Sequence, residues 1–154
     1  MNQISLLYNY IKELGEADPY VSTITKNASS ELLQDKVTIF PLLNIFISNV
    51  TYNSPQTKLF TLEISCFNKR DVNKTYVNDK FYGNDNELDN MNETEACLSR
   101  IWLNSYRNFQ SNNILAQEAP TLEPVLEGTT ALVDGWVMTV NIEVPNTVMN
   151  ICND

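Results

Sequence analysis

The fold is decided by residues 36–68, which read KVTIFPLLNIFISNVTYNSPQTKLFTLEISCFN. The first half, Lys36–Tyr52, is rich in β-branched and aromatic residues and is apolar on both alternating faces, which predicts a buried strand. In the second half, Lys58–Asn68, every other residue is apolar, so one face of a second strand is expected to cover a core. The residues between them, Asn53–Gln56, are typical of a turn and predict an antiparallel hairpin.

Two prolines and two further segments indicate how the sheet extends beyond this hairpin. Pro41 has no N–H to donate to a strand ladder, so we expect the first strand to lie at an edge or to bulge there. Near the C-terminus, Gly135–Val144 alternates cleanly and predicts a strand. Thr121–Leu126 is interrupted by Pro124, which favours an edge strand or an extended arm.

Two segments carry helical periodicity. Met1–Gly15 places Ile4, Leu7, Ile11 and Leu14 on one face, and Gly15 is expected to supply a left-handed C-terminal cap. Asn84–Gln110 has a longer apolar stripe, with Asn84 and Glu87 spaced as a capping box. Its acidic residues gather in the first half and its arginines in the second, which suits the helix dipole.

The order helix, strand, strand, helix, strand, strand predicts an α+β fold. We expect a small, mainly antiparallel sheet of about four strands, flanked on one face by an N-terminal helix and one long helix. The length of 154 residues predicts a single domain over residues 1–154. Long loops are expected at about 18–35 and 69–84, where the only β-like run is Tyr20–Thr25.

Charge and composition exclude several classes of protein. The chain has 10 Lys and Arg, 19 Asp and Glu and no His, which gives a net charge of −9. Without histidine there is no Ser-His-Asp triad, Cys-His dyad or His-based metal site. The excess of acidic residues argues against a nucleic-acid-binding surface, which needs basic residues to neutralise phosphates. No run of about 18 apolar residues indicates a membrane span.

No catalytic or cofactor constellation emerges from the remaining residues. The four glycines are isolated, which argues against a phosphate-binding loop. Cys66, Cys97 and Cys152 lack metal-ligand spacing and are expected to be reduced, mostly buried core thiols. The carboxylates at the start of the long helix are interpreted as a solvated, capped first turn. We therefore expect no enzymatic activity, no cofactor and no metal.

Two other functions are considered on charge alone. One is an acidic inhibitor that mimics DNA and blocks a host enzyme, but here the acidic residues are diluted by Lys and Arg and the hydrophobic content is high, at 43%. The other is an enzyme that uses a carboxylate pair with a bound metal, for which thermal stabilisation by divalent cations would be the sign. Both rank below a binding or structural role.

Several short segments together resemble a known family, the small neck and tail-completion proteins of tailed bacteriophages, above all those of crAss-like and other phages of Bacteroides-type hosts. The resemblance covers roughly residues 20–152 and depends on order and spacing. The segments are Val37–Leu42, Asn49–Thr51, Asn84–Met91, Glu123-Pro124, Gly135-Trp136, Val144–Asn146 and Ile151-Cys152.

The resemblance implies a virion structural protein that forms a homo-oligomeric ring, with twelve subunits favoured and six possible. Such a ring lies in the neck or tail, contacts the portal protein and other neck and tail proteins, and is assembled in the host cytoplasm. DNA passes through it without specific binding, and no membrane is involved. The antiparallel sheet with flanking helices of the tail-terminator and completion group agrees with the fold predicted above, and the family has no catalytic residues to transfer.

The ring hypothesis gives the acidic residues and the loops expected roles. Carboxylates that face the lumen would repel DNA phosphates, and the candidates are Asp79, Asp85, Glu87, Asp89 and Glu93. The loops at Tyr20–Asp35 and Lys69–Gly83 are expected to bridge neighbouring subunits. Candidate bridging residues are Tyr20, Lys69, Arg70, Tyr76, Phe81 and Tyr82.

Overall fold

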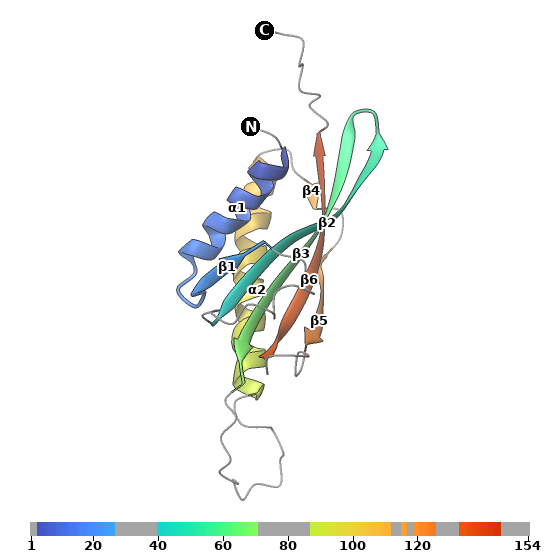
Figure 1. Cartoon of the computed structure of the whole chain (residues 1–154). Helices are drawn as coiled ribbons and strands as arrows, with labels where there is room; N and C mark the ends of the chain where they lie inside the picture. The colour runs from blue at the N-terminus through green and yellow to red at the C-terminus, as the bar shows by residue number, and fades with distance from the viewer. Residues whose placement is uncertain are drawn as a thin grey trace, which may run out of the picture.

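The computed structural model describes residues 3–26, 40–70, 87–111, 115–116, 119–125 and 133–145. Two helices and six strands occur in these ranges, and the predicted α+β class is confirmed (Figure 1). The elements are α1 (Gln3–Ala17), β1 (Thr23–Thr25), β2 (Leu42–Ser54), β3 (Thr57–Lys69), α2 (Glu87–Ser111), β4 (Leu115–Ala116), β5 (Thr121–Val125) and β6 (Val133–Pro145).

The strands form one sheet with the order β1-β2-β3-β6, and both β4 and β5 pair with the other edge of β6. All pairings are antiparallel except that of β1 with β2. The predicted hairpin is confirmed, with a turn at Pro55 and Gln56. The expected strand that contains Pro124 is β5, and it pairs at the edge of the sheet. The two extra strands, β1 and β4, have three and two residues, which is too short for alternation to reveal.

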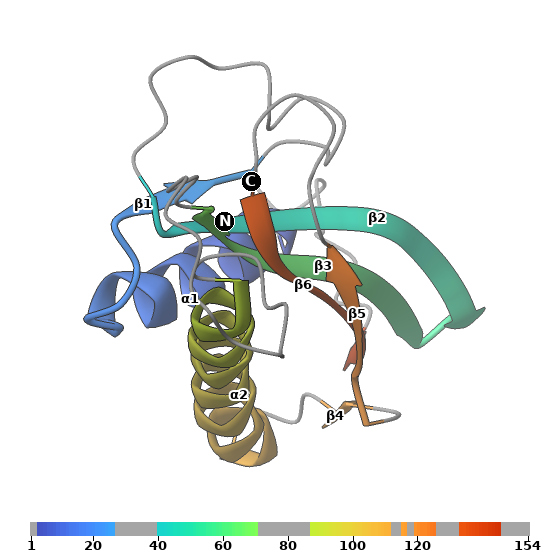
Figure 2. The same ribbon diagram turned by 90° about the horizontal axis from the view of Figure 1, so that it is seen from below.

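Both helices cover the same face of the sheet, as expected (Figure 2). The strand register explains the core, because Leu43, Cys66 and Trp136 lie side by side on neighbouring strands and face the helix layer. The next row on that face consists of Ile45, Ile64 and Met138, which are again neighbours on adjacent strands. The alternation of the sequence therefore becomes a row of apolar side chains beneath α1 and α2.

Gly15 has a different role from the expected C-terminal cap. Helix α1 continues to Ala17, and Gly15 has no left-handed backbone conformation. A Cβ atom at this position would lie 2.6 Å from Leu43 Cδ2 and 3.0 Å from Ile24 Cδ1. The cap prediction is wrong because this glycine is selected for close packing of the helix on the sheet.

Pro41 lies immediately before β2, so it interrupts no ladder within the described residues. Its carbonyl accepts hydrogen bonds from the N–H groups of Ser22, at 2.9 Å, and Thr23, at 3.2 Å. These bonds place β1 beside the start of β2. The expected strand start at Lys36 and the capping box at Asn84 lie outside the described residues.

Candidate functional site

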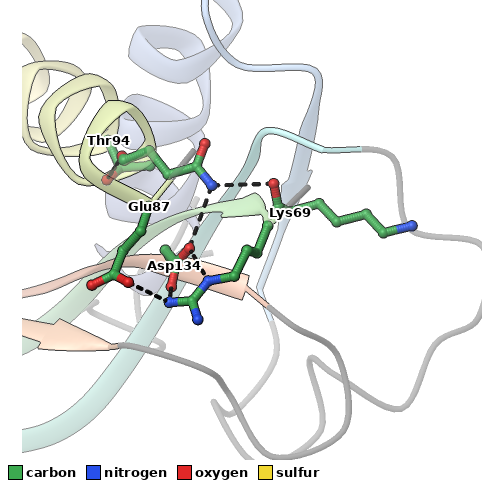
Figure 3. Close-up of polar contacts among 6 residues, drawn as sticks. Lys69, Glu87, Thr94 and Asp134 are labelled. Carbon is green, nitrogen blue, oxygen red and sulfur yellow. Dashed lines mark hydrogen bonds and ion pairs between the residues drawn. The ribbon is translucent and has the colours of Figure 1, made fainter. Parts of the chain in front are cut away.

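A cluster of buried polar residues joins the end of β3 to the starts of β6 and α2 (Figure 3). The guanidinium of Arg70 donates from Nε to Asp134 Oδ2 at 3.0 Å and from Nη2 to Asp134 Oδ1 at 2.6 Å. Nη2 also lies 3.1 Å from Glu87 Oε2. The side chains of Arg70 and Asp134 are 5% and 0% exposed, so this bidentate pair is shielded from water.

Asn90 completes this cluster from the first turns of α2. Its Nδ2 donates to the Lys69 carbonyl at 3.1 Å and lies 3.5 Å from Asp134 Oδ2. Its Oδ1 accepts a bond of 3.1 Å from Asn68 Nδ2. Because the buried polar groups bind one another, the cluster holds the helix and two strands in one arrangement.

The cluster also fixes both ends of the segment 71–86. Arg70 directly precedes this segment and Glu87 directly follows it, and the two side chains are ion-paired. The two described residues that flank this segment in the sequence are therefore in contact. The segment contains the predicted residues Tyr76, Asp79, Phe81, Tyr82 and Asp85, which lie outside the described residues.

Arg70 is a candidate bridging residue from the sequence. In the structure its side chain is buried and forms an ion pair with Asp134 of the same chain. The sequence carries one signal for this role. Asp134 stands among the apolar residues at the start of a strand, beside Val133, and a buried carboxylate requires a cation. The register then places Asp134 opposite Asn68, two residues from Arg70, and that register cannot be read without the long-range pairing.

Tyr20 lies in a second internal contact. Asp18 accepts from Arg100 Nε at 2.8 Å and Nη2 at 3.0 Å, and from the N–H of Tyr20 at 3.0 Å. Burial works to raise the pKa of Asp18, but these hydrogen bonds outweigh it and lower that pKa. The Tyr20 side chain is partly buried against the core, and this burial raises its pKa. Its predicted role as a bridge between subunits stays a prediction.

The predicted acidic residues that lie in the described ranges differ in how exposed they are. Glu87 is partly buried against Arg70, with 22% of its side chain exposed. Asp89 and Glu93 are exposed on α2, as is Glu95, which was not among the predicted residues. Lys69 is exposed at the end of β3. The first half of α2 therefore presents unburied carboxylates, as its sequence predicts.

The thiols of Cys66 and Cys97 are free and fully buried, at 0% exposure each. The neighbouring thiol of Cys97 and burial both raise the pKa of Cys66. A thiol with a raised pKa has little thiolate, so it is a poor nucleophile. The predicted burial is confirmed for these two residues, while Cys152 lies outside the described residues.

A hollow of about 420 Å³ lies between α1 and the strands β1 and β2. No pattern in the sequence predicts this hollow. Two lysines and no carboxylate contribute to its walls, although the chain as a whole is acidic. The lining residues are Ser5, Tyr8, Asn9, Lys12, Ile24, Thr25, Lys26 and Ile45.

Within the described ranges, no group of three or more His, Cys, Asp or Glu side chains is placed to hold a metal ion. Neither of the two helices that the structure describes is both long and apolar enough to cross a membrane.

No protein-family model matches the sequence, and no curated protein matches it.

Proposed function

We propose that the chain is a structural protein of a tailed-phage virion, a homo-oligomeric ring in the neck or tail that connects the portal vertex to the tail. The ring encloses the channel through which DNA is ejected. Twelve subunits are favoured and six are possible. The resemblance of the sequence to neck and tail-completion proteins is the source of this proposal, and the α+β fold is compatible with it.

The observation that carries the proposal is the exposed acidic surface of α2. Asp89 and Glu93 stand one turn apart and are exposed. By contrast, two of the three arginines, Arg70 and Arg100, are paired with carboxylates inside the same chain, while Arg107 is exposed near the end of α2. The outer surface therefore retains its carboxylates while part of the positive charge is used internally.

An acidic lumen has a physical purpose in a DNA channel. Basic residues bind DNA because they release condensed counterions from the phosphates. Carboxylates gain nothing from this release and repel the phosphates, so DNA slides past them without adhering. With Asp89 and Glu93 repeated in every subunit, the lumen would become a continuous acidic collar.

The segment 71–86 supplies the proposed bridge between subunits. The residues that flank it in the sequence, Arg70 and Glu87, are ion-paired with each other. Its aromatic residues, Tyr76, Phe81 and Tyr82, are proposed to contact the adjacent subunit. Within the other predicted loop, residues 18–26 pack on the domain or pair with its sheet, which leaves residues 27–35 for such a role.

The proposal is tested by the mass and shape of the purified protein. Native mass spectrometry and negative-stain microscopy are expected to show a closed ring, either alone or after addition of the portal protein. A chain that stays monomeric at every concentration, with and without the portal protein, would contradict the proposal. A monomer that instead inhibits a host nuclease would favour the DNA-mimic alternative.

A further inference from the structure

The helix layer carries most of the apolar surface that the described residues leave exposed. Five of the six large exposed apolar side chains lie on α1 and α2, and the sixth, Tyr52, lies on β2. On α2 they are Leu88, Leu103 and Tyr106, which are 51%, 53% and 44% exposed. The outer side of α2 is therefore a surface that a partner would shield from water.

These side chains share a face with one carboxylate. Glu95 follows Leu88 by seven residues and Tyr106 follows it by eighteen, which are about two and five helical turns, so the three lie along one line of the helix. The Tyr106 ring is steadied by Trp102, with 5.7 Å between ring centroids. We call Leu88, Glu95, Leu103 and Tyr106 the outer face of α2.

The hollow beside α1 has the complementary character. Its apolar wall includes Ile24, Ile45 and the ring of Tyr8, whose hydroxyl accepts the Ile47 N–H at 3.0 Å. Lys26 Nζ lies 6.0 Å from the centre of that ring, and Lys12 adds a second positive charge. Lys12 Nζ also lies 3.5 Å from Glu16 Oε1, but both side chains are more than half exposed, so this surface pair is weak. The two lysines therefore still favour a ligand that carries negative charge.

We propose that the outer face of α2 docks onto this hollow in a second copy of the chain. Glu95 then faces Lys12 and Lys26, while Leu88 covers the apolar wall. The inference rests on the proposed ring, for which it names the subunit contact. Because two different surfaces meet, the contact is head-to-tail, and contacts of this kind close into rings when the rotation between copies allows it.

Two sets of substitutions break the contact from opposite sides. Lys12→Glu with Lys26→Glu reverses the charge of the hollow, and Leu88→Ser with Leu103→Ser removes apolar area from the outer face. All four side chains are exposed, so folding is expected to be unchanged. Each double variant alone should weaken the subunit contact about tenfold or more, which sedimentation velocity would record as a loss of rings. Lys58→Glu is the charge-reversal control on β3, away from both surfaces, and should keep its rings.

Mixing the two double variants is the sharper test. One intact outer face meets one intact hollow, so the mixture should form a dimer and stop there. A triple variant that adds Glu95→Lys to the reversed hollow should regain rings, because opposite charges face each other again. Rings that survive both double variants would overturn the inference and leave the proposed ring standing, whereas a wild-type chain that never forms rings counts against the ring itself. If the hollow variants lose only portal binding, the occupant is a different protein and the inference also falls.

Discussion

Two arginine–aspartate pairs join elements of the domain, and they differ in how far water reaches them. Arg70–Asp134 links the end of β3 to the start of β6, and Arg100–Asp18 links α2 to the residue that follows α1. In the Arg70–Asp134 pair the side chains are 5% and 0% exposed. In the Arg100–Asp18 pair the arginine side chain is 45% exposed and the aspartate 5%. Water therefore hardly reaches the charged groups of the first pair, whereas the arginine of the second pair is still about half solvated. Similar geometry should therefore have different energetic consequences.

The largest expected effect is at the buried pair. Asp134→Ala leaves the Arg70 charge buried without its bidentate carboxylate, so we expect a loss of about 3–5 kcal/mol in the free energy of unfolding. Urea denaturation followed by circular dichroism measures this loss. The matched control is Arg70→Met combined with Asp134→Leu, which removes both charges and should recover much of the stability. A loss below about 1 kcal/mol for Asp134→Ala would show that water reaches this pair after all.

A packing contact gives the next largest effect. Gly15→Ala places a Cβ atom 2.6 Å from Leu43 Cδ2, so the buried leucine side chain or the helix must shift. The higher helix propensity of alanine offsets about 1 kcal/mol of this cost, so we expect a net loss of about 1–2 kcal/mol. Shortening the leucine with Leu43→Val should recover part of the loss when it is combined with Gly15→Ala. At the neighbouring exposed position, Glu16→Ala should change the free energy of unfolding by less than about 0.5 kcal/mol. A more stable Gly15→Ala variant would contradict the close approach.

The half-exposed pair should contribute less and should do so in a pH-dependent manner. Asp18→Asn is expected to cost about 1 kcal/mol at neutral pH, because water already solvates Arg100. The pKa of Asp18 is lowered by folding, so its stabilising charge is present above the unfolded value near 3.8 and is lost as the pH falls through the lower folded value. The stability difference between wild type and Asp18→Asn should therefore shrink below about pH 4. A difference that stays constant between pH 7 and pH 2.5 would contradict this assignment.

The two pairs also show what the sequence could and could not predict. Local periodicity was sufficient for β3, β6 and both helices, since each buries one regular face. It was insufficient for Gly15 and Arg70, whose roles depend on Leu43 and Asp134, residues far away in the chain. The hollow beside α1 was missed for the same reason, because Lys12 and Lys26 meet only after α1 folds onto the sheet. The acidic face of α2 was predicted because it is a property of one helix.

The smallest effect on stability is expected at the carboxylates that neither pair uses. Asp89→Asn with Glu93→Gln should change the free energy of unfolding by less than about 1 kcal/mol, because both side chains are exposed. The variant removes a charge in the first turn of α2, which suits the helix dipole, and the Glu93 carboxylate beside the Tyr20 hydroxyl. If they line a DNA channel, the same double variant should bind linear double-stranded DNA at low salt, where the wild-type ring does not. Because screening weakens such electrostatic effects, the difference should fade as the salt concentration rises. Equal DNA retention by wild type and variant rings at low salt would place these carboxylates outside the lumen, and a large loss of stability would mean that they form contacts within the chain.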